Sequence, residues 1–185
     1  AFQGYLEDNT EAPINLILAQ GLPKADKMDF IVQKAVELGV TEIQPLIMEN
    51  CVVKYDEAKK SQRQTKWQKI ANEAAKQCGR TVIPEIKPII TLGEFLKSLP
   101  KSCNKIVCYE AENNNGIKKL LDNTNSVDYC VFVGPEGGFS NNEIKICNEN
   151  SCQPVTLGPR ILRTETASLA AISIILYHKG DLGGF

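Results

Sequence analysis

The chain has 185 residues, of which 43% are hydrophobic and 23% charged, and its formal net charge is −1. These values suit one large globular domain whose core needs neither a disulfide nor a structural metal. They exclude a strongly basic nucleic-acid-binding chain, so any RNA contact must come from a local basic patch or a partner domain.

The first half of the chain predicts alternating strands and helices. Apolar runs typical of strands and apolar steps of three and four, typical of helices, follow one another as strand 14–20, helix 26–39, strand 40–48, helix 58–78 and helix 92–99. Gly39 and Gly79 stand where C-terminal caps are expected. A proline-punctuated stretch at residues 82–88 separates the last two helices.

The second half is more regular. It predicts strand 105–109, helix 116–121, strand 128–133, helix 140–148, strand 154–157 and helix 165–179. Ser140 and Glu143 form the capping box that opens the fourth of these elements. Residues 167–177 are apolar on nearly all sides, which fits a central core helix or a subunit interface equally well. The alternation predicts an α/β fold with a mostly parallel sheet.

Several classes of site and location are disfavoured by what the sequence lacks. The seven cysteines form no C-x-x-C pair, and His178 is the single histidine. We therefore expect no metal site and no Ser-His-Asp triad, and interpret the cysteines as reduced residues, mostly of the core. No apolar run reaches the roughly 18 residues that span a membrane and no signal peptide is seen, so we expect a cytoplasmic protein without membrane contact.

A glycine-rich turn follows the strand at residues 128–133 and reads VGPEGGFS over residues 133–140. Ligands bind at this edge of open α/β sheets, and glycines let them approach the backbone closely. No G-K-[ST] follows, and Pro135 lacks an amide that a phosphate cradle would use. A purely structural tight turn is the alternative interpretation.

A second segment, residues 157–167, reads LGPRILRTETA between a buried strand and the apolar helix. Burying two arginines and a glutamate there is costly unless they are paired or used. The simpler interpretation is a structural Arg-Glu pair at a helix N-terminus, where Glu165 is favoured by the dipole. Two weaker candidates are Arg80, just past a helix end, and the basic start of a helix at residues 24–30, whose simplest interpretation is a solvated face.

The combination of segments resembles the RsmE family, the small-subunit (16S) ribosomal RNA uridine-N3 methyltransferases of the SPOUT superfamily. The segments that carry the resemblance are KMDFIVQKAVELGV, QCGRTVIPE, VGPEGGFS and LGPRILRTETA, starting at residues 27, 77, 133 and 157. The resemblance runs from about residue 14 to residue 183. It is specific because four motifs occur in order at fitting separations.

The resemblance implies a deep trefoil knot over about residues 128–179, an exception to the rule against threaded connections. It also implies S-adenosylmethionine as the cofactor, held by loop backbone, with Tyr109 and Glu110 closing the pocket. The implied cofactor-binding residues are Gly134, Gly137, Gly138, Leu157, Gly158, Ile161, Leu162 and Tyr109.

The family is dimeric with the active site at the subunit interface, so the resemblance implies a homodimer that acts on ribosomal RNA of the small ribosomal subunit. It also implies that residues 1–12 are the remnant of an N-terminal PUA-like domain and its linker, and that residues 13–185 are the SPOUT methyltransferase domain. For catalysis we expect Arg163 to stabilise the uridine, Glu165 to orient it, and Arg80 to contribute to the RNA site, from either subunit.

Other functions stay open on sequence alone. They are another SPOUT-type RNA methyltransferase, a Rossmann-like nucleotide enzyme, and a non-catalytic RNA-binding or ribosome-assembly module. The missing dinucleotide fingerprint counts against the second. Titration with S-adenosylmethionine separates a methyltransferase from the last two.

Overall fold

The computed structural model describes residues 10–183, so most of the expected remnant and linker at residues 1–12 lies outside the described part. Its central feature is a parallel sheet of seven strands in the order β3-β2-β1-β6-β5-β7, with β4 also paired to β2. The strands are β1 Asn15–Gly21, β2 Glu42–Ile47, β3 Glu85–Ile86, β4 Ile90–Thr91, β5 Asn104–Cys108, β6 Asp128–Val133 and β7 Gln153–Val155.

Helices follow most of the strands, as expected for a parallel sheet. They are α1 Lys27–Leu38, α2 Glu57–Cys78, α3 Leu92–Ser98, α4 Ile117–Asp122, α5 Asn141–Glu149 and α6 Thr164–His178. Gly39 and Gly79 cap α1 and α2 in the left-handed conformation, and the Ser140–Glu143 capping box opens α5. The α/β fold and these local signals are therefore confirmed.

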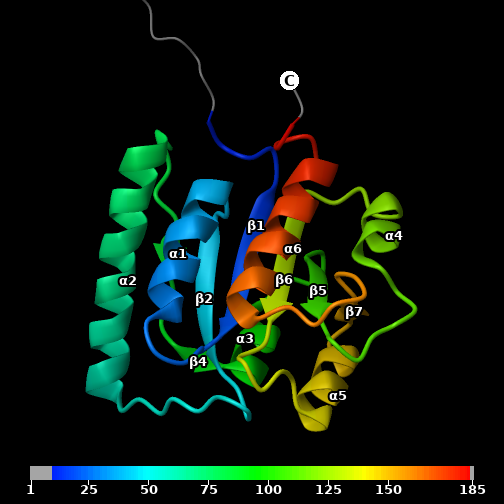
Figure 1. Cartoon of the computed structure of the whole chain (residues 1–185), viewed down its shortest axis with the longest axis horizontal. Coiled ribbons are helices and arrows are strands. Elements are labelled where there is room, and N and C mark those ends of the chain that lie inside the picture. The colour runs from blue at the N-terminus through cyan, green and yellow to red at the C-terminus, as the bar shows by residue number, and fades with distance from the viewer. Residues whose placement is uncertain (1–9, 184–185) are drawn as a thin grey trace, which may run out of the picture.

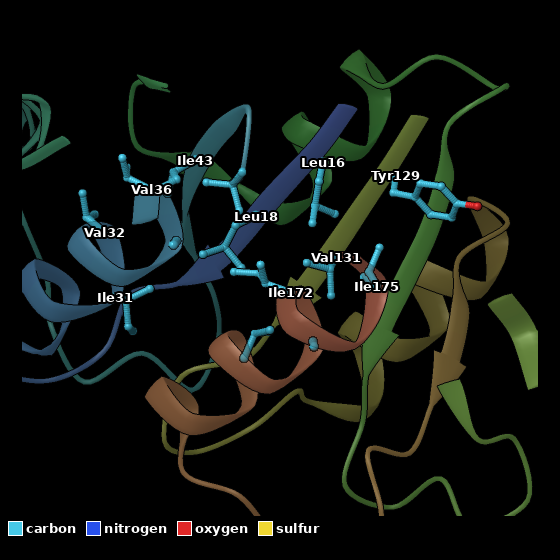
Figure 2. Packing of buried hydrophobic residues seen from close by; sticks show 14 of the residues in the cluster. Leu16, Leu18, Ile31, Val32, Val36, Ile43, Tyr129, Val131, Ile172 and Ile175 are labelled. Carbon is cyan, nitrogen blue, oxygen red and sulfur yellow. The ribbon is translucent and has the colours of Figure 1, made fainter. Parts of the chain in front are cut away.

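The helices form two layers, one on each face of the sheet. One core lies under α1, α2, α4 and α6, and a second core lies under α3 and α5. Figure 1 shows α1 and α6 in front of the strands, α2 beside α1 at the left flank, and α3 behind the strands. In Figure 2, Leu16 and Leu18 of β1 and Val131 of β6 point towards the helices that carry Ile31 and Ile172.

The neighbouring central strands β1 and β6 create the switch point of the sheet. The chain leaves β1 through α1 on the front face, whereas it leaves β6 through α5 on the opposite face. Such a reversal opens a crevice at the carboxyl ends of the strands. All pairings are parallel, so the ends of β1, β5, β6 and β7 meet at one edge.

Two details of the sequence prediction need correction. The stretch at residues 82–88 contains β3, and β4 follows it, but two-residue strands are too short to show an apolar period. Helix α6 is buried on one face only, because Tyr177 is 70% exposed while Ile172 and Ile175 are fully buried. No helix within residues 10–183 has the length and apolarity that crossing a membrane requires.

Candidate cofactor pocket and active site

A cavity of about 660 Å³ lies at the carboxyl edge of the sheet. Its walls come from the residues that follow β5, β6 and β7, namely 108–110, 133–136 and 155–164, with Lys27, Asn113, Gly138 and Ala167. The volume falls in the range of cofactor pockets, roughly 300–1,000 Å³. Three segments far apart in the sequence therefore build one site at the place that the strand ends predicted.

Seven of the eight proposed cofactor-binding residues line this cavity. Tyr109 belongs to the first wall segment, Gly134 and Gly138 to the second, and Leu157, Gly158, Ile161 and Leu162 to the third. Gly137 is not on the wall. A β-carbon at Gly137 would approach the Asn50 side chain to 2.8 Å, so this glycine lets the turn pack against the loop after β2.

Gly138 is required by both its conformation and its surroundings. Its φ is +65°, a value that side chains rarely adopt, and a β-carbon there would lie 2.2 Å from Oε1 of Glu110. The Asn50 amide donates to the carbonyls of Gly137 at 2.9 Å and Gly138 at 3.3 Å. The turn is thus held from two sides, with the Glu110 carboxylate against it.

A buried polar network fixes the glycine turn to β1 and α6. The Thr164 hydroxyl donates to the Gly134 carbonyl at 2.6 Å and accepts from the Gln20 amide at 3.0 Å. The Ser168 hydroxyl bonds to Gln20 Oε1, and the Gln20 amide also donates to the Gly21 carbonyl at 2.8 Å. The three side chains are at most 4% exposed. This network connects the wall of the cavity to the core of the sheet.

Charged side chains gather at the mouth of the cavity. The Lys27 ammonium lies 3.0 Å from Oε1 of Glu136 and 3.1 Å from Oε2 of Glu165. Hydrogen bonds to Glu136 and Glu165 raise the pKa of Lys27. Burial raises the pKa of each carboxyl, but its own backbone amide and Lys27 outweigh burial and lower it. All three groups therefore stay charged at neutral pH.

The two expected catalytic residues Arg163 and Glu165 differ in their position relative to the cavity. Arg163 lines the cavity, as expected for a residue that faces the substrate. Glu165 does not line the cavity. Its carboxylate forms an ion pair with Lys27 of α1, in place of the Arg-Glu pair that was the simpler interpretation of the sequence. The expectation that the charges of this segment are buried is wrong for both arginines, because Arg160 and Arg163 are exposed, whereas the Glu165 side chain is 21% exposed. Ile161 is 86% exposed.

Arg80 lies at the opposite edge of the sheet and not at the cavity of its own subunit. Its guanidinium pairs with Glu11 at 2.6 Å and donates to the carbonyls of Val40 at 2.7 Å and Val36 at 3.1 Å. Only 3% of the side chain is exposed. These contacts make Arg80 a structural link between the start of β1, α1 and the end of α2. They leave few guanidinium donors available to bind RNA.

The sequence interpretation missed Gln20, Asn50, Glu136 and the active-site position of Lys27. Gln20 was visible as an amide within the apolar run of β1, and a buried amide needs a hydrogen-bond partner. Lys27 was interpreted as part of a solvated face because its two carboxylate partners lie more than 100 residues away in sequence. Residues 10–183 contain no group of three or more His, Cys, Asp or Glu side chains that could hold a metal ion.

Comparison with known proteins agrees with this geometry. Residues 10–176 match the RNA methyltransferase domain family. The Bacillus subtilis ribosomal RNA small subunit methyltransferase E is 35% identical over 97% of this chain and 72% of its own length. A crystal structure of the Neisseria gonorrhoeae ribosomal RNA small subunit methyltransferase E bound to S-adenosylmethionine is 38% identical. It has a TM-score of 0.82 and covers 91% of this chain and 69% of the other. An Aquifex aeolicus TrmH/SpoU tRNA-modifying enzyme, 16% identical over 92% of this chain and 76% of its own with a TM-score of 0.55, shares the fold.

Proposed function

Because the chain belongs to the ribosomal RNA small subunit methyltransferase E family of SPOUT-class enzymes, we propose that it methylates N3 of a uridine in small-subunit (16S) ribosomal RNA. The cofactor is S-adenosylmethionine, as in the Neisseria relative. The observation that carries the proposal is the cavity at the sheet edge, walled by the glycine turn and by residues 155–164.

The residues of the cavity fit this cofactor. Gly138 keeps the turn free of a side chain that would collide with Glu110, and Gly134 stands beside it, so main-chain groups face the cavity. Ile161 and Leu162 offer apolar surface for an adenine ring, and Glu110 offers an acceptor for hydroxyl or ammonium groups. We propose that these groups, with Tyr109, Leu157 and Gly158, hold the cofactor.

The chemistry requires alignment, loss of a proton and control of charge. When bound, S-adenosylmethionine supplies a methyl group on a sulfonium, which is transferred in line to N3. Holding the reacting atoms in line can lower the barrier by roughly 7–11 kcal/mol. The N3–H proton must leave as the N–C bond forms, and Glu110 and Glu136 are the carboxylates on the cavity wall that could accept it. Arg163 would stabilise negative charge on the uracil oxygens.

In this scheme Glu165 is a positioning residue. Its carboxylate pairs with the Lys27 ammonium, which also pairs with Glu136. Glu165 therefore helps to fix the position of Lys27 and, through it, of Glu136 at the cavity mouth. Arg80 is left out of the reaction within one subunit because its guanidinium is already bonded to Glu11 and to two carbonyls.

Methyl transfer to small subunits that lack the modification tests the proposal. Arg163→Ala should lower kcat/KM by about 100- to 1,000-fold, the usual cost of one charge-stabilising donor, with the dissociation constant of S-adenosylmethionine little changed. Arg160→Ala is the matched control, because Arg160 also lines the cavity and is exposed. Equal activity of Arg163→Ala and wild type would remove the assignment. A chain that binds no S-adenosylmethionine would remove the function.

We also propose a homodimer, a knot over about residues 128–179, a remnant of a PUA-like domain at residues 1–12 and a cytoplasmic location. The dimer is supported by the half-exposed apolar face of α6, where Leu169, Ile174 and the 70% exposed Tyr177 lie. Ile174→Glu should give a monomer in light scattering after gel filtration. The knot is supported by the shared fold of the SPOUT-class relatives.

A further inference from the structure

We propose that α2 carries the docking surface for the RNA strand next to the target base, an inference that rests on the proposed function. Helix α2 holds six Lys or Arg and two Glu in 22 residues, whereas the whole chain has 21 Lys and Arg against 22 Asp and Glu. Helix α2 therefore carries four more basic than acidic residues in a chain whose net charge is −1, which is the local patch that an RNA contact requires.

Four of the six basic residues of α2 form one exposed stripe, in which Glu73 pairs with Lys76 at 2.9 Å. Lys59, Lys66, Lys69 and Lys76 are exposed and follow one another at steps of seven, three and seven, which places them on one face. Trp67, Ala71, Ala74 and Ala75 are buried on the other face. At a rise of about 1.5 Å per residue the stripe is about 26 Å long. Helix α2 lies at the left flank of the molecule in Figure 1.

The stripe starts at the same edge of the sheet as the cavity and is connected to it. Helix α2 begins after the carboxyl end of β2 and runs back along the sheet (Figure 1). Asp26, at the start of α1, lies 3.7 Å from Arg63 and 3.8 Å from Lys66. The next residue, Lys27, forms an ion pair with Glu136 on the cavity wall. The first turn of α1 thus bridges the cavity mouth and the middle of α2.

The charge pattern favours this path over the other face of the sheet. Within residues 10–183, neither Lys59 nor Lys69 has a carboxylate at ion-pair distance, whereas Lys66 shares Asp26 and Asp29. Helix α5, on the opposite face, carries two Glu and one Lys. A target base must leave its helix to reach the cavity, so the flanking strand has to cross the surface beside the mouth. Lysines bind such a strand through its phosphates.

The test compares two triple variants of the 185-residue chain. The first, Lys59→Gln with Lys66→Gln and Lys69→Gln, neutralises the stripe. The second, Lys97→Gln with Lys101→Gln and Lys145→Gln, makes the same charge change at exposed lysines on or next to α3 and α5, the helices of the other face. Binding of unmodified small-subunit ribosomal RNA is measured at several salt concentrations, together with S-adenosylmethionine affinity and kcat at saturating RNA.

The stripe variant should lower the slope of log affinity against log salt by about two, at roughly 0.7 per lost phosphate contact. At 0.1 M salt that slope corresponds to a loss of affinity of up to about 100-fold. The affinity for S-adenosylmethionine and kcat should match wild type, and the control should keep the wild-type slope.

Three results would overturn the inference: no salt-dependent RNA binding by the wild-type chain, a stripe variant that binds RNA like wild type, or a control that weakens equally. Loss of RNA binding in the stripe variant of a chain that transfers no methyl group would instead remove the proposed function and leave the docking surface standing.

Discussion

The Thr164 hydroxyl is the point where the core of the sheet and the wall of the cavity share hydrogen bonds. It donates to the Gly134 carbonyl at 2.6 Å and accepts from the Gln20 amide at 3.0 Å, and Thr164 is only 4% exposed. Thr164→Val keeps the shape of the side chain and removes the hydroxyl. We therefore expect this single change to weaken both the fold and the binding of the cofactor.

The expected loss of stability in Thr164→Val follows from the hydrogen-bonding groups that lose their partner. Gln20 keeps its bond to the Gly21 carbonyl, whereas the Gly134 carbonyl loses a buried donor. One buried polar group without its partner costs about 1–3 kcal/mol. For a chain of this size that corresponds to a fall in Tm of roughly 3–9 °C. The affinity for S-adenosylmethionine can fall by at most the same free energy, about 100-fold.

Thermal unfolding and calorimetric titration with S-adenosylmethionine measure the two effects. Thr164→Ser is the matched control, because it keeps the hydroxyl and loses only a methyl group. The order of both Tm and affinity should be wild type, then Thr164→Ser, then Thr164→Val. A Thr164→Val protein with the Tm and cofactor affinity of Thr164→Ser would refute the view that this hydroxyl holds the glycine turn.

Three further outcomes follow from the same structure. Gly138→Ala should lower Tm and cofactor affinity, since φ is +65° and the new methyl meets Glu110, while Gly93→Ala, in open space on α3, should leave Tm unchanged or raise it. Burial raises the pKa of Glu11, but Arg80 and the amides of Val82 and Thr81 outweigh it and lower the pKa; the stability that Glu11 adds is therefore complete above its ordinary pKa and lost as pH falls through the folded one. Urea unfolding should show Glu11→Gln less stable than wild type at pH 7, with a gap that closes towards pH 3. Burial raises the pKa of Cys103 to about 11 and of Cys108 to about 12, so alkylation of the native protein at pH 8, read by mass spectrometry, should spare both and modify the half-buried Cys78 first.

Sequence reasoning recovered the elements whose signals are local. The period of α2, the αL caps at Gly39 and Gly79, and the capping box at Ser140 each depend on residues within a few positions of one another. The position of the cavity was also predictable, because the carboxyl ends of parallel strands share one edge and the glycine turn marks one of them. Only the two-residue strands β3 and β4 escaped.

The side-chain partners could not be predicted, because they join segments that the sequence does not relate. Lys27, at the start of α1, forms ion pairs with Glu136 of the glycine turn and Glu165 of α6. The Arg80 guanidinium, after the end of α2, pairs with Glu11, which precedes β1. A periodic pattern reports which face of a helix is buried, but it carries no information about which charge lies opposite. The contacts of Arg80 within its own subunit could not be foreseen for this reason.

The arrangement separates the residues that build the cavity from those that face its contents. Gln20, Thr164 and Ser168 are buried and bonded to one another, so changes there alter folding and cofactor affinity together. Arg160, Ile161 and Arg163 are exposed on the same short loop, and they can change at little cost to the core. A cofactor bound at 100 times its dissociation constant would stabilise the native chain by about 2.7 kcal/mol, a gain comparable to the loss expected for Thr164→Val. The thermal stability of that variant should therefore depend on S-adenosylmethionine concentration more weakly than that of wild type, whereas Arg163→Ala should keep the wild-type dependence.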